Sequence, residues 1–532
     1  MALVEKMLLR ERIANRPKHW VRLTTACNNT CLFCLDMDTP RNVYLEREPV
    51  EAEIRRGLEE LGATKIILSG GEASVHPLFP HFIRYALELG YERVQTVTNG
   101  MRYGEKAFFD SVMEAGLGEI TFSLHGHTEG LHDRLVQTPG AWRRLIKGLM
   151  RAVRHRNQHG WPIVNIDVVI NRQNVAVLDK IVELGVSLGV KEYDLLHVIP
   201  QAEAYRRRDE LFYDVREHLP VLQKVFRLNR RPDFHIWTNR FPVSYLEGLE
   251  DLIQDPHKMI DEVRGRKFHV RRYVDTGEPL DCREKERCQH CFIAPFCETL
   301  EDSISAVHER GDAVVQRTER QRTGPLTLEP GAVVELTQTT AEELLARRDE
   351  LDGVQLHQPS YETLQEASEH DVRDPAAFFQ TLGRRVAVSG LPACQAPGTM
   401  LVPEETTLPA EVFEAGRLQW KPLARHHVTE RYRAKSVRCR DCRVNDRCRG
   451  LHINMIRDQG LQLARPLVDG DWADEAEAQL ASWPRPTRMA EGPRPQPAHP
   501  SLFGHPEPTE PPVDPLANPP KPRRADVARQ AD

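Results

Sequence analysis

Hydrophobic and polar positions follow a regular strand-then-helix pattern along the first two hundred residues. Apolar runs of strand length, such as IVNIDVVI, alternate with longer segments of helical spacing, for example Ile54, Leu58 and Leu61 on one helix face. The pattern predicts strands at 18–25, 64–69, 92–98, 118–124, 163–170 and 192–199, with helices near 49–61, 77–89, 105–115, 140–155 and 175–188. Because this order suits parallel strands joined by right-handed crossovers, we predict an α/β fold in which six units form an open, partial (βα)6 barrel.

The strand–helix rhythm fades after residue 205, and two cysteine-bearing regions follow. The first contains a C-x5-C-x2-C-x5-C run, and the second contains a C-x2-C-x5-C run preceded by the isolated Cys394. The shared C-x2-C-x5-C core indicates a duplicated module. We predict smaller α+β modules here, with domain ranges of 1–16 (N-terminal helix), 17–230 (barrel), 231–330 (first cysteine module), 331–470 (second cysteine module) and 483–532 (Pro-rich, disordered tail).

Composition narrows the class of protein. The chain has 532 residues with 40% hydrophobic and 28% charged residues, as expected for several globular domains. Its net charge of −6 gives no reason to expect a nucleic-acid partner. No apolar stretch is long enough to span a membrane, and the charged N-terminus lacks the apolar core of a secretory signal. We therefore expect a cytoplasmic protein whose eleven cysteines are reduced metal ligands rather than disulfides.

Three cysteines on the loop after the first predicted strand carry the most specific chemistry. Cys27, Cys31 and Cys34 form a C-x3-C-x2-C spacing in CNNTCLFC. Three thiolates can hold three irons of a four-iron cube and leave the fourth iron without a protein ligand. An open metal position is characteristic of catalytic sites rather than closed structural sites.

Other polar and glycine-rich positions fall at the ends of the next predicted strands. Gly70, Gly71 and Glu72 follow the second strand, Asn99 follows the third, and Ser123 lies near the end of the fourth. Ligands of parallel α/β folds gather beyond the carboxyl ends of the strands, so these residues and the cysteine triplet predict one shared site. Asn99 and Ser123 are alternatively simple turn residues.

Together these motifs resemble those of the radical S-adenosylmethionine (radical SAM) enzymes, which combine C-x3-C-x-φ-C with a GGE motif after the second strand. Phe33 occupies the aromatic position φ, and the resemblance spans roughly residues 17–200. It implies a TIM-like partial barrel, a 4Fe-4S cluster on the three cysteines and SAM bound at the open iron. The implied reaction is reductive cleavage of SAM to a 5′-deoxyadenosyl radical, which abstracts hydrogen from a substrate.

The resemblance also implies roles for individual residues and partners. Gly70, Gly71 and Glu72 would meet the methionine amino group, and Phe33 would border the adenine. Asn99 and Ser123 would contact the ribose or the methionine carboxylate. A flavodoxin or ferredoxin would supply the electron. His125 and His127 are more simply explained as loop residues bonded to the backbone than as catalytic bases.

The downstream cysteines resemble the auxiliary-cluster modules of these enzymes, called SPASM and twitch domains, but only in part. No cysteine follows Cys297 or Cys448 at three residues, and the usual opening cysteine pair is missing. Eight thiols suffice for two four-cysteine sites. The simplest partition assigns Cys282, Cys288, Cys291 and Cys297 to one site, and Cys394, Cys439, Cys442 and Cys448 to the other. Zinc at these sites, or buried unliganded cysteines, are the alternatives.

Three functions are consistent with the sequence. The first is a radical SAM enzyme that modifies a peptide or protein side chain, which is the commonest substrate class among relatives with auxiliary clusters. The second is a radical SAM enzyme of small-molecule or cofactor biosynthesis. The third, of another class, is a non-catalytic metal-binding scaffold whose cysteine modules and tail bind partners.

Overall fold

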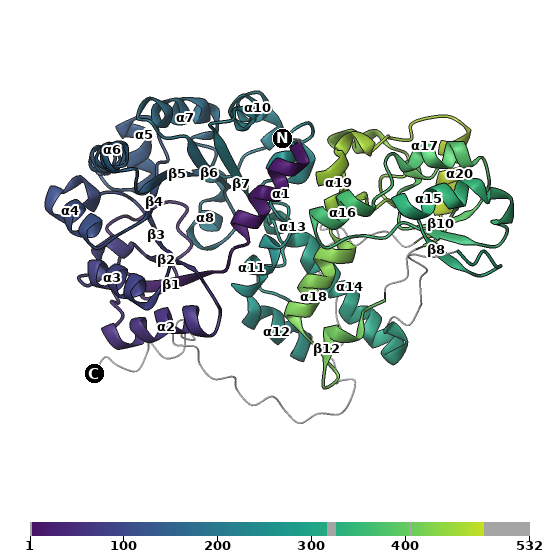
Figure 1. Cartoon of the computed structure of the whole chain (residues 1–532), viewed down its shortest axis with the longest axis horizontal. Coiled ribbons are helices and arrows are strands. Elements are labelled where there is room, and N and C mark those ends of the chain that lie inside the picture. The colour runs from purple at the N-terminus through teal and green to yellow at the C-terminus, as the bar shows by residue number, and fades with distance from the viewer. Residues whose placement is uncertain (1–2, 316–325, 404–406, 484–532) are drawn as a thin grey trace. The chain divides into compact units, whose positions relative to one another are not determined.

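The computed structural model describes residues 3–315, 326–403 and 407–483 (Figure 1). Apart from Trp483, the Pro-rich tail predicted from residue 483 lies outside the described residues. The chain forms two compact units. One, the barrel unit, takes in residues 15–214 and 220–237; the other, the cysteine-rich unit, takes in the N-terminal helix, residues 215–219 and the described residues between 238 and 483.

The barrel unit is built around a seven-stranded sheet whose strands lie in sequence order from β1 to β7. Neighbouring strands from β1 to β6 all pair in parallel. The strands are β1 (Lys18–Thr24), β2 (Lys65–Gly70), β3 (Arg93–Thr98), β4 (Glu119–Ser123), β5 (Ile163–Ile170), β6 (Glu192–His197) and β7 (His235–Asn239). The predicted α/β class with a parallel, partial barrel is confirmed, and the six predicted strands differ from the observed ones by at most two residues at either end.

Helices connect successive strands and surround the sheet in Figure 1. They are α2 (Arg47–Glu59), α3 (Phe79–Leu89), α4 (Lys106–Glu114), α5 (Glu129–Val136), α6 (Ala141–His159), α7 (Leu178–Ser187), α8 (Ala202–Arg206), α9 (Arg208–Leu211) and α10 (Leu219–Phe226). Alternate strand residues such as Ile120 and Phe122 are fully buried, whereas Glu119, Thr121 and Ser123 form the polar face of the same strand. This two-residue period gives the sheet a second, polar face on which ligand-binding groups can lie.

Among the strands and α-helices of the barrel unit, β7, α5, α8, α9 and α10 were not predicted. Strand β7 is only five residues long and has two buried positions, Ile236 and Thr238, which is too little pattern to identify a strand. Helix α5 follows directly after the loop of His125 and His127. Its N-cap is Thr128, whose side chain accepts a hydrogen bond from the Leu131 N–H, and this start signal was not recognised in the sequence. The sheet therefore has one strand more than the six that were expected.

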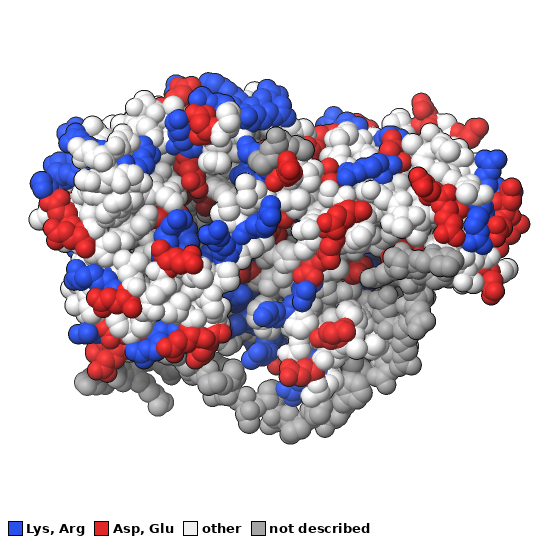
Figure 2. Space-filling model, in the orientation of Figure 1, with Lys and Arg blue, Asp and Glu red and all other residues white. Residues whose placement is uncertain are grey.

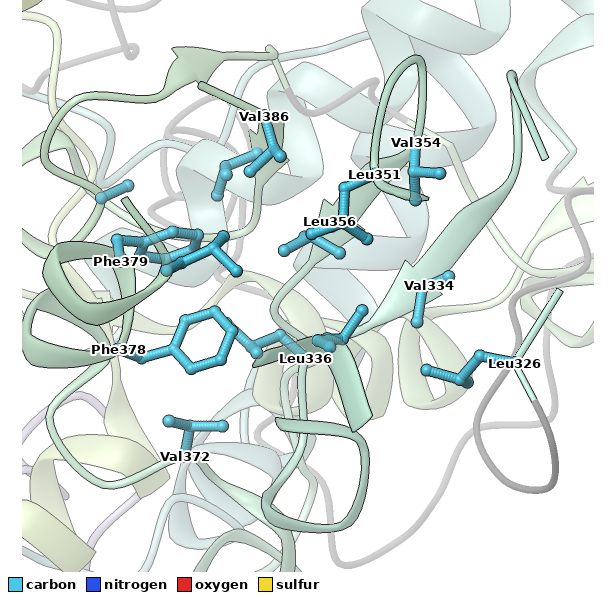
Figure 3. Packing of buried hydrophobic residues seen from close by; sticks show 14 residues of the cluster. Leu326, Val334, Leu336, Leu351, Val354, Leu356, Val372, Phe378, Phe379 and Val386 are labelled. Atoms are coloured by element: carbon cyan, nitrogen blue, oxygen red, sulfur yellow. The ribbon is translucent and has the colours of Figure 1, made fainter. Parts of the chain in front are cut away.

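The cysteine-rich unit contains a smaller parallel sheet in the order β11-β10-β9-β8. Its hydrophobic core gathers side chains from the strands and from α17, including Val334, Leu356 and Phe379 (Figure 3). We predicted α+β modules, and the parallel arrangement of this sheet was not foreseen because its strands have only two or three residues. The strands of the unit are β8 (Val333–Glu335), β9 (Gln355–His357), β10 (Ala387–Ser389), β11 (Met400–Leu401), β12 (Phe413–Glu414), β13 (Arg417–Leu418), β14 (Arg433–Ala434) and β15 (Leu451–His452).

The N-terminal helix belongs to this second unit. Glu11 of α1 pairs with the buried Arg457 at 2.5 Å, and α1 contacts α16. The helices of the unit are α1 (Leu3–Ala14), α11 (Lys258–Arg264), α12 (Lys267–Thr276), α13 (Lys285–Cys288), α14 (Ala294–Arg310), α15 (Gln338–Ala346), α16 (Leu364–His370), α17 (Pro375–Leu382), α18 (Trp420–His426), α19 (Ile453–Gln459) and α20 (Asp471–Leu480). Among the described helices, none combines the length and apolarity that a membrane crossing requires.

Acidic and basic side chains are interspersed over the face of the molecule shown in Figure 2. This distribution accords with the small net charge of −6.

Candidate functional site

The loop that carries Cys27, Cys31 and Cys34 begins directly after β1, at the carboxyl edge of the first sheet. Burial raises the pKa of Cys27 to about 12, and the negative charge of Glu72 adds to the effect. Burial also raises the pKa of Cys31, and charges on Cys27 and Cys34 raise it further. The structure thus brings the three thiols within electrostatic range of one another, where a bound cationic centre would stabilise their ionised forms.

Gly70 and Gly71 are required by the close approach of two backbone segments. A Cβ atom on Gly70 would lie 2.3 Å from the Thr24 carbonyl oxygen, and one on Gly71 would lie 2.5 Å from the Ala26 oxygen. Gly70 also has a φ of +152°. The backbone N–H of Gly71 donates to Thr24 at 2.8 Å. The glycine pair therefore fixes the start of the cysteine loop against the end of β2.

Glu72 is buried and accepts three hydrogen bonds from the protein. The Thr98 hydroxyl donates to Oε1 at 2.7 Å, the Ser74 N–H donates to Oε1 at 3.1 Å, and the Asn99 N–H donates to Oε2 at 2.7 Å. An ionised carboxylate offers about four lone-pair positions, so one acceptor position stays available beyond these bonds. Glu72 thus ties the end of β2 to the end of β3, a structural role that the sequence did not indicate.

Asn99 extends this network into the cysteine loop. Its side-chain Nδ2 donates to Asn28 Oδ1 at 2.6 Å, and its Oδ1 accepts from the Met101 N–H at 3.1 Å. Asn28 lies between Cys27 and Cys31. The GGE motif, Asn99 and the cysteine loop are therefore connected by direct hydrogen bonds.

Ser123, the last residue of β4, and Asp167, in the middle of β5, form a polar pair. The Ser123 hydroxyl donates to Asp167 Oδ1 at 2.7 Å, and the two residues are paired in the strand register. Burial raises the pKa of Asp167 to about 7, and the nearby charge of Asp194 raises it as well. The charge of Asp167 in turn raises the pKa of Cys31, so Asp167 interacts electrostatically with the cysteine triplet.

Phe33 is buried and packs edge-to-face against His125, with ring centroids 4.7 Å apart. His125 accepts a hydrogen bond from the Val169 N–H through Nδ1 at 3.2 Å and stacks on His132. Burial holds the pKa of His125 well below its usual range. These contacts agree with the interpretation of His125 as a loop residue bonded to the backbone.

Asn29 provides a test of whether the cysteine loop fits a bound group. Its side chain is 3% exposed, and neither its Oδ1 nor its Nδ2 has a hydrogen-bond partner among the described residues. Its backbone N–H donates to Cys27 Sγ at 3.4 Å. Because a buried, unsatisfied amide is costly, the loop is suited to a polar or charged group held by the cysteines. The donor set of three thiols beside this amide fits an iron–sulfur cluster.

The first downstream group of four cysteines is also brought together. Burial raises the pKa of Cys288 and of Cys297, and the charges of Cys291 and Cys282 raise both further, so the four thiols interact electrostatically. Two arginines contact the group: Arg266 Nη1 donates to Cys291 Sγ at 3.6 Å, and Arg283 Nη1 donates to Cys288 Sγ at 3.7 Å.

The second downstream group joins the isolated cysteine to the C-x2-C-x5-C run. Burial raises the pKa of Cys394 to about 12, and charges on Cys448, Cys439 and Cys442 raise it further. Cys394 lies on a 3-10 helix (Ala393–Gln395) just after β10. Backbone N–H groups of Gly450 and Leu467 donate to Cys448 Sγ at 3.2 Å and to Cys442 Sγ at 3.3 Å.

Within residues 3–315, 326–403 and 407–483, no three His, Cys, Asp or Glu side chains are placed so that they could hold one metal ion. In an iron–sulfur cube each thiolate ligates a different iron, so cluster ligands are spread over several metal atoms.

Sequence reasoning missed several contributors to these sites. Asn28 and Asn29 lie inside the recognised CNNTC motif, but nothing in their spacing distinguishes them from loop residues. Asp167 could have been noticed, because it is an acidic residue in the otherwise apolar strand IVNIDVVI. Arg266 lies sixteen residues before Cys282, and only the folded chain brings it to the cysteines.

Comparison with known proteins gives a family match for part of the barrel unit. Residues 21–185 match the radical SAM superfamily. The chain is 28% identical over 218 residues to the probable GTP 3',8-cyclase of Saccharolobus solfataricus. The aligned region covers 40% of this chain and 68% of that protein. It is 26% identical over 239 residues to the probable GTP 3',8-cyclase of Sulfurisphaera tokodaii, covering 44% of this chain and 72% of that protein.

Solved structures show a weaker similarity. SuiB of Streptococcus suis bound to the precursor peptide SuiA aligns with a TM-score of 0.35 and 15% identity, over 47% of this chain and 55% of that chain. Methylornithine synthase (PylB) aligns with a TM-score of 0.33 and 16% identity, over 44% of this chain and 69% of that chain. The chain thus spans little more than half of SuiB.

Proposed function

Given a radical SAM enzyme domain over residues 21–185, we propose that the protein binds a 4Fe-4S cluster through Cys27, Cys31 and Cys34 and takes a hydrogen atom from its substrate. The observation that carries this proposal is the hydrogen-bond network from Glu72 through Asn99 to Asn28, inside the cysteine loop. It links the cluster motif to the GGE motif at one edge of the parallel sheet, where α/β folds bind ligands.

A 4Fe-4S cluster held by the three cysteines would supply the electron for reductive cleavage of SAM. The protein residues bind and orient the reactants. Gly70 and Gly71 let the backbone come close to the methionine end of SAM, and the remaining acceptor position of Glu72 receives its ammonium group. The electron comes from a flavodoxin or ferredoxin.

Phe33 and Ser123 border the nucleoside in this proposal. Phe33 offers an apolar ring beside His125 for the adenine. Ser123 has its hydroxyl proton directed to Asp167, so its oxygen is available to accept a hydrogen bond from a ribose hydroxyl. A primary radical attacks most C–H bonds. The main task of these residues is therefore to hold SAM close to the substrate hydrogen in the orientation that the transfer requires.

We further propose that each four-cysteine group holds an auxiliary iron–sulfur cluster. The first group falls in the module of residues 231–330, and the second falls in the SPASM-like module of residues 331–470. The mutual pKa effects of the thiols within each group support this partition. Zinc is the alternative metal, since clustered cysteines also bind zinc.

For the substrate we propose a peptide or protein side chain, on the strength of the two auxiliary cysteine groups. A nucleotide is the second candidate, because relatives of the barrel region are named probable GTP 3',8-cyclases. Those relatives match about 40% of the chain, so their names do not establish the substrate of this protein.

The test is anaerobic cleavage of SAM. The full chain is purified without oxygen, reduced with dithionite and given SAM, and 5′-deoxyadenosine is measured with and without GTP. We expect product that disappears in the Cys27→Ala, Cys31→Ala, Cys34→Ala variant. A fully iron-loaded protein that forms no product would instead support the scaffold function. Product that rises at least tenfold with GTP would favour the nucleotide.

A further inference from the structure

The first auxiliary cysteine group differs from an ordinary set of clustered thiols because two guanidinium groups contact its sulfur atoms. Arg266 donates to Cys291 Sγ at 3.6 Å, and Arg283 donates to Cys288 Sγ at 3.7 Å. Both arginines belong to the same unit as the cysteines. Their positive charges also face the other two thiols, since charges on Cys282 and Cys297 act on Arg266 and the charge on Cys297 acts on Arg283.

The two arginines have different electrostatic roles. Arg283 is 7% exposed and forms a bidentate pair with Glu301, at 2.7 and 2.8 Å. The carboxylate of Glu301 offsets most of the charge that Arg283 would present to the sulfur atoms. Glu301 lies one helical turn after Cys297 on α14, so this pair also fixes the helix that supplies the fourth thiol.

Arg266 lies just before α12, between Gly265 and Lys267. An arginine side chain is not deprotonated in proteins, so its guanidinium presents a permanent positive charge. The contact with Cys291 Sγ at 3.6 Å places that charge at the cysteine group.

A cluster held by four thiolates carries net negative charge, and one-electron reduction adds another negative charge. Hydrogen bonds to the sulfur atoms and nearby cations stabilise the more negative form, and they raise the reduction potential. Charge-assisted bonds from a guanidinium are stronger than bonds from neutral backbone N–H groups.

The geometry points to Arg266 as a redox-tuning residue: its guanidinium stabilises the reduced form of the first auxiliary centre and raises that centre's reduction potential. Arg283 contributes less, because Glu301 shares its charge. This inference rests on the proposed presence of a cluster at Cys282, Cys288, Cys291 and Cys297. It concerns the electron affinity of that centre and is independent of the identity of the substrate.

The test is a potentiometric titration with dithionite, followed by electron paramagnetic resonance, of the full chain carrying Cys27→Ala, Cys31→Ala and Cys34→Ala. Only the auxiliary centres remain in this background, and the second centre serves as an internal reference. The signal of the first centre is identified by its loss in a Cys282→Ala, Cys291→Ala variant.

Three substitutions separate charge from hydrogen bonding: Arg266→Lys keeps the charge, Arg266→Gln keeps an N–H donor, and Arg266→Met keeps neither. We expect the reduced-to-oxidised ratio of the first centre at fixed potential to fall at least tenfold in Arg266→Met, a shift of about 59 mV for a one-electron couple. Arg266→Gln should be intermediate, Arg266→Lys closest to the parent, and the second centre unchanged.

The matched control is Arg272→Gln on α12, the helix that Arg266 precedes, where the arginine side chain is 50% exposed and pairs with Glu278 at 3.0 Å. It should leave both potentials unchanged. Equal potentials for the first centre in the parent and in Arg266→Met would overturn the inference. If Arg266→Met loses iron, the comparison uses Arg266→Lys and Arg266→Gln instead. The inference would be overturned if these two variants had the same reduction potential at the first centre. A parent protein with zinc and no labile sulfide would instead refute the auxiliary cluster itself.

Discussion

The Ser123 hydroxyl donates a hydrogen bond to Asp167 Oδ1 at 2.7 Å across the neighbouring strands β4 and β5. Burial raises the pKa of Asp167 to about 7. The folded protein therefore binds the Asp167 proton more tightly than the unfolded chain does, and this carboxyl group destabilises the fold increasingly as pH rises from about 4 to 7.

Asp167→Asn should remove this pH dependence, because the amide is neutral at every pH. We expect the melting temperature of Asp167→Asn, relative to wild type, to be higher at pH 8 than at pH 5, measured by thermal unfolding under nitrogen. SAM cleavage should fall more than tenfold, because the amide no longer fixes the Ser123 proton in the same way. Identical pH slopes for the two proteins would show that Asp167 is already ionised in the native state.

Gly71→Ala should damage the cysteine loop directly. The new Cβ would lie 2.5 Å from the Ala26 oxygen and 2.7 Å from the Thr25 oxygen, and both are backbone atoms that cannot rotate away. We expect a loss of about 1–3 kcal/mol in the free energy of unfolding and reduced iron per chain after anaerobic reconstitution.

The matched control for Gly71→Ala is Gly130→Ala on α5. A Cβ at Gly130 meets no atom within 4 Å, and alanine favours the helix by about 1 kcal/mol over glycine. This variant should keep full iron loading and equal or greater stability. Normal iron loading in Gly71→Ala would mean that the loop adapts to the added methyl group.

The barrel could be predicted because its signals are local. Strand β5 has six buried residues among its eight, and IVNIDVVI reads as a strand without any further information. The same holds for the glycines that end β2, whose place after an apolar run marks a close approach. The smaller sheet escaped prediction because β8, β9 and β10 have three residues each and β11 has two, and their pairing depends on contacts across tens of residues.

The residue types of the candidate site were proposed from the sequence, whereas its hydrogen bonds were not. The spacing of Cys27, Cys31 and Cys34 identified the loop, yet the bonds that anchor it run from Asn28 to Asn99 over seventy-one residues. Glu72 was expected to face a ligand, and most of its acceptor capacity serves Thr98, Ser74 and Asn99. Long-range hydrogen bonds of this kind leave no periodic signal in the sequence.

Asn29→Leu should have opposite effects on the stability of the protein without a cluster and with a cluster in the cysteine loop. The buried amide has no hydrogen-bond partner among the described residues. An unsatisfied buried polar group destabilises the folded state by about 1–3 kcal/mol, and an apolar side chain of similar size removes that cost. We expect the cluster-free protein to be equally or more stable after the substitution, and the reconstituted protein to be less stable, by thermal unfolding of both forms. A similar loss in both forms would mean that the amide has a partner other than the bound group.

His257 should make the stability of the cysteine-rich unit depend on alkaline pH. Its Nδ1 bonds Asp255 Oδ1 at 3.0 Å and its Nε2 bonds Glu362 Oε1 at 3.0 Å. These two carboxylates, Asp255 first, raise the pKa of His257 to about 9. Because the folded-state pKa lies above the unfolded value, the stabilisation is fully present below pH 6.5 and is lost as pH rises through 9.

His257→Ala should therefore lower the melting temperature strongly at pH 6 and only slightly at pH 10. Each unit of pKa shift corresponds to about 1.4 kcal/mol, and solvent screens part of this at a side chain that is 31% exposed, so we expect a loss of about 2–3 kcal/mol at pH 6. The control is His269→Ala, an exposed histidine of α12, which should change the melting temperature little at either pH. An equal loss in His257→Ala at pH 6 and pH 10 would show that packing, and not the ionised imidazole, stabilises this contact.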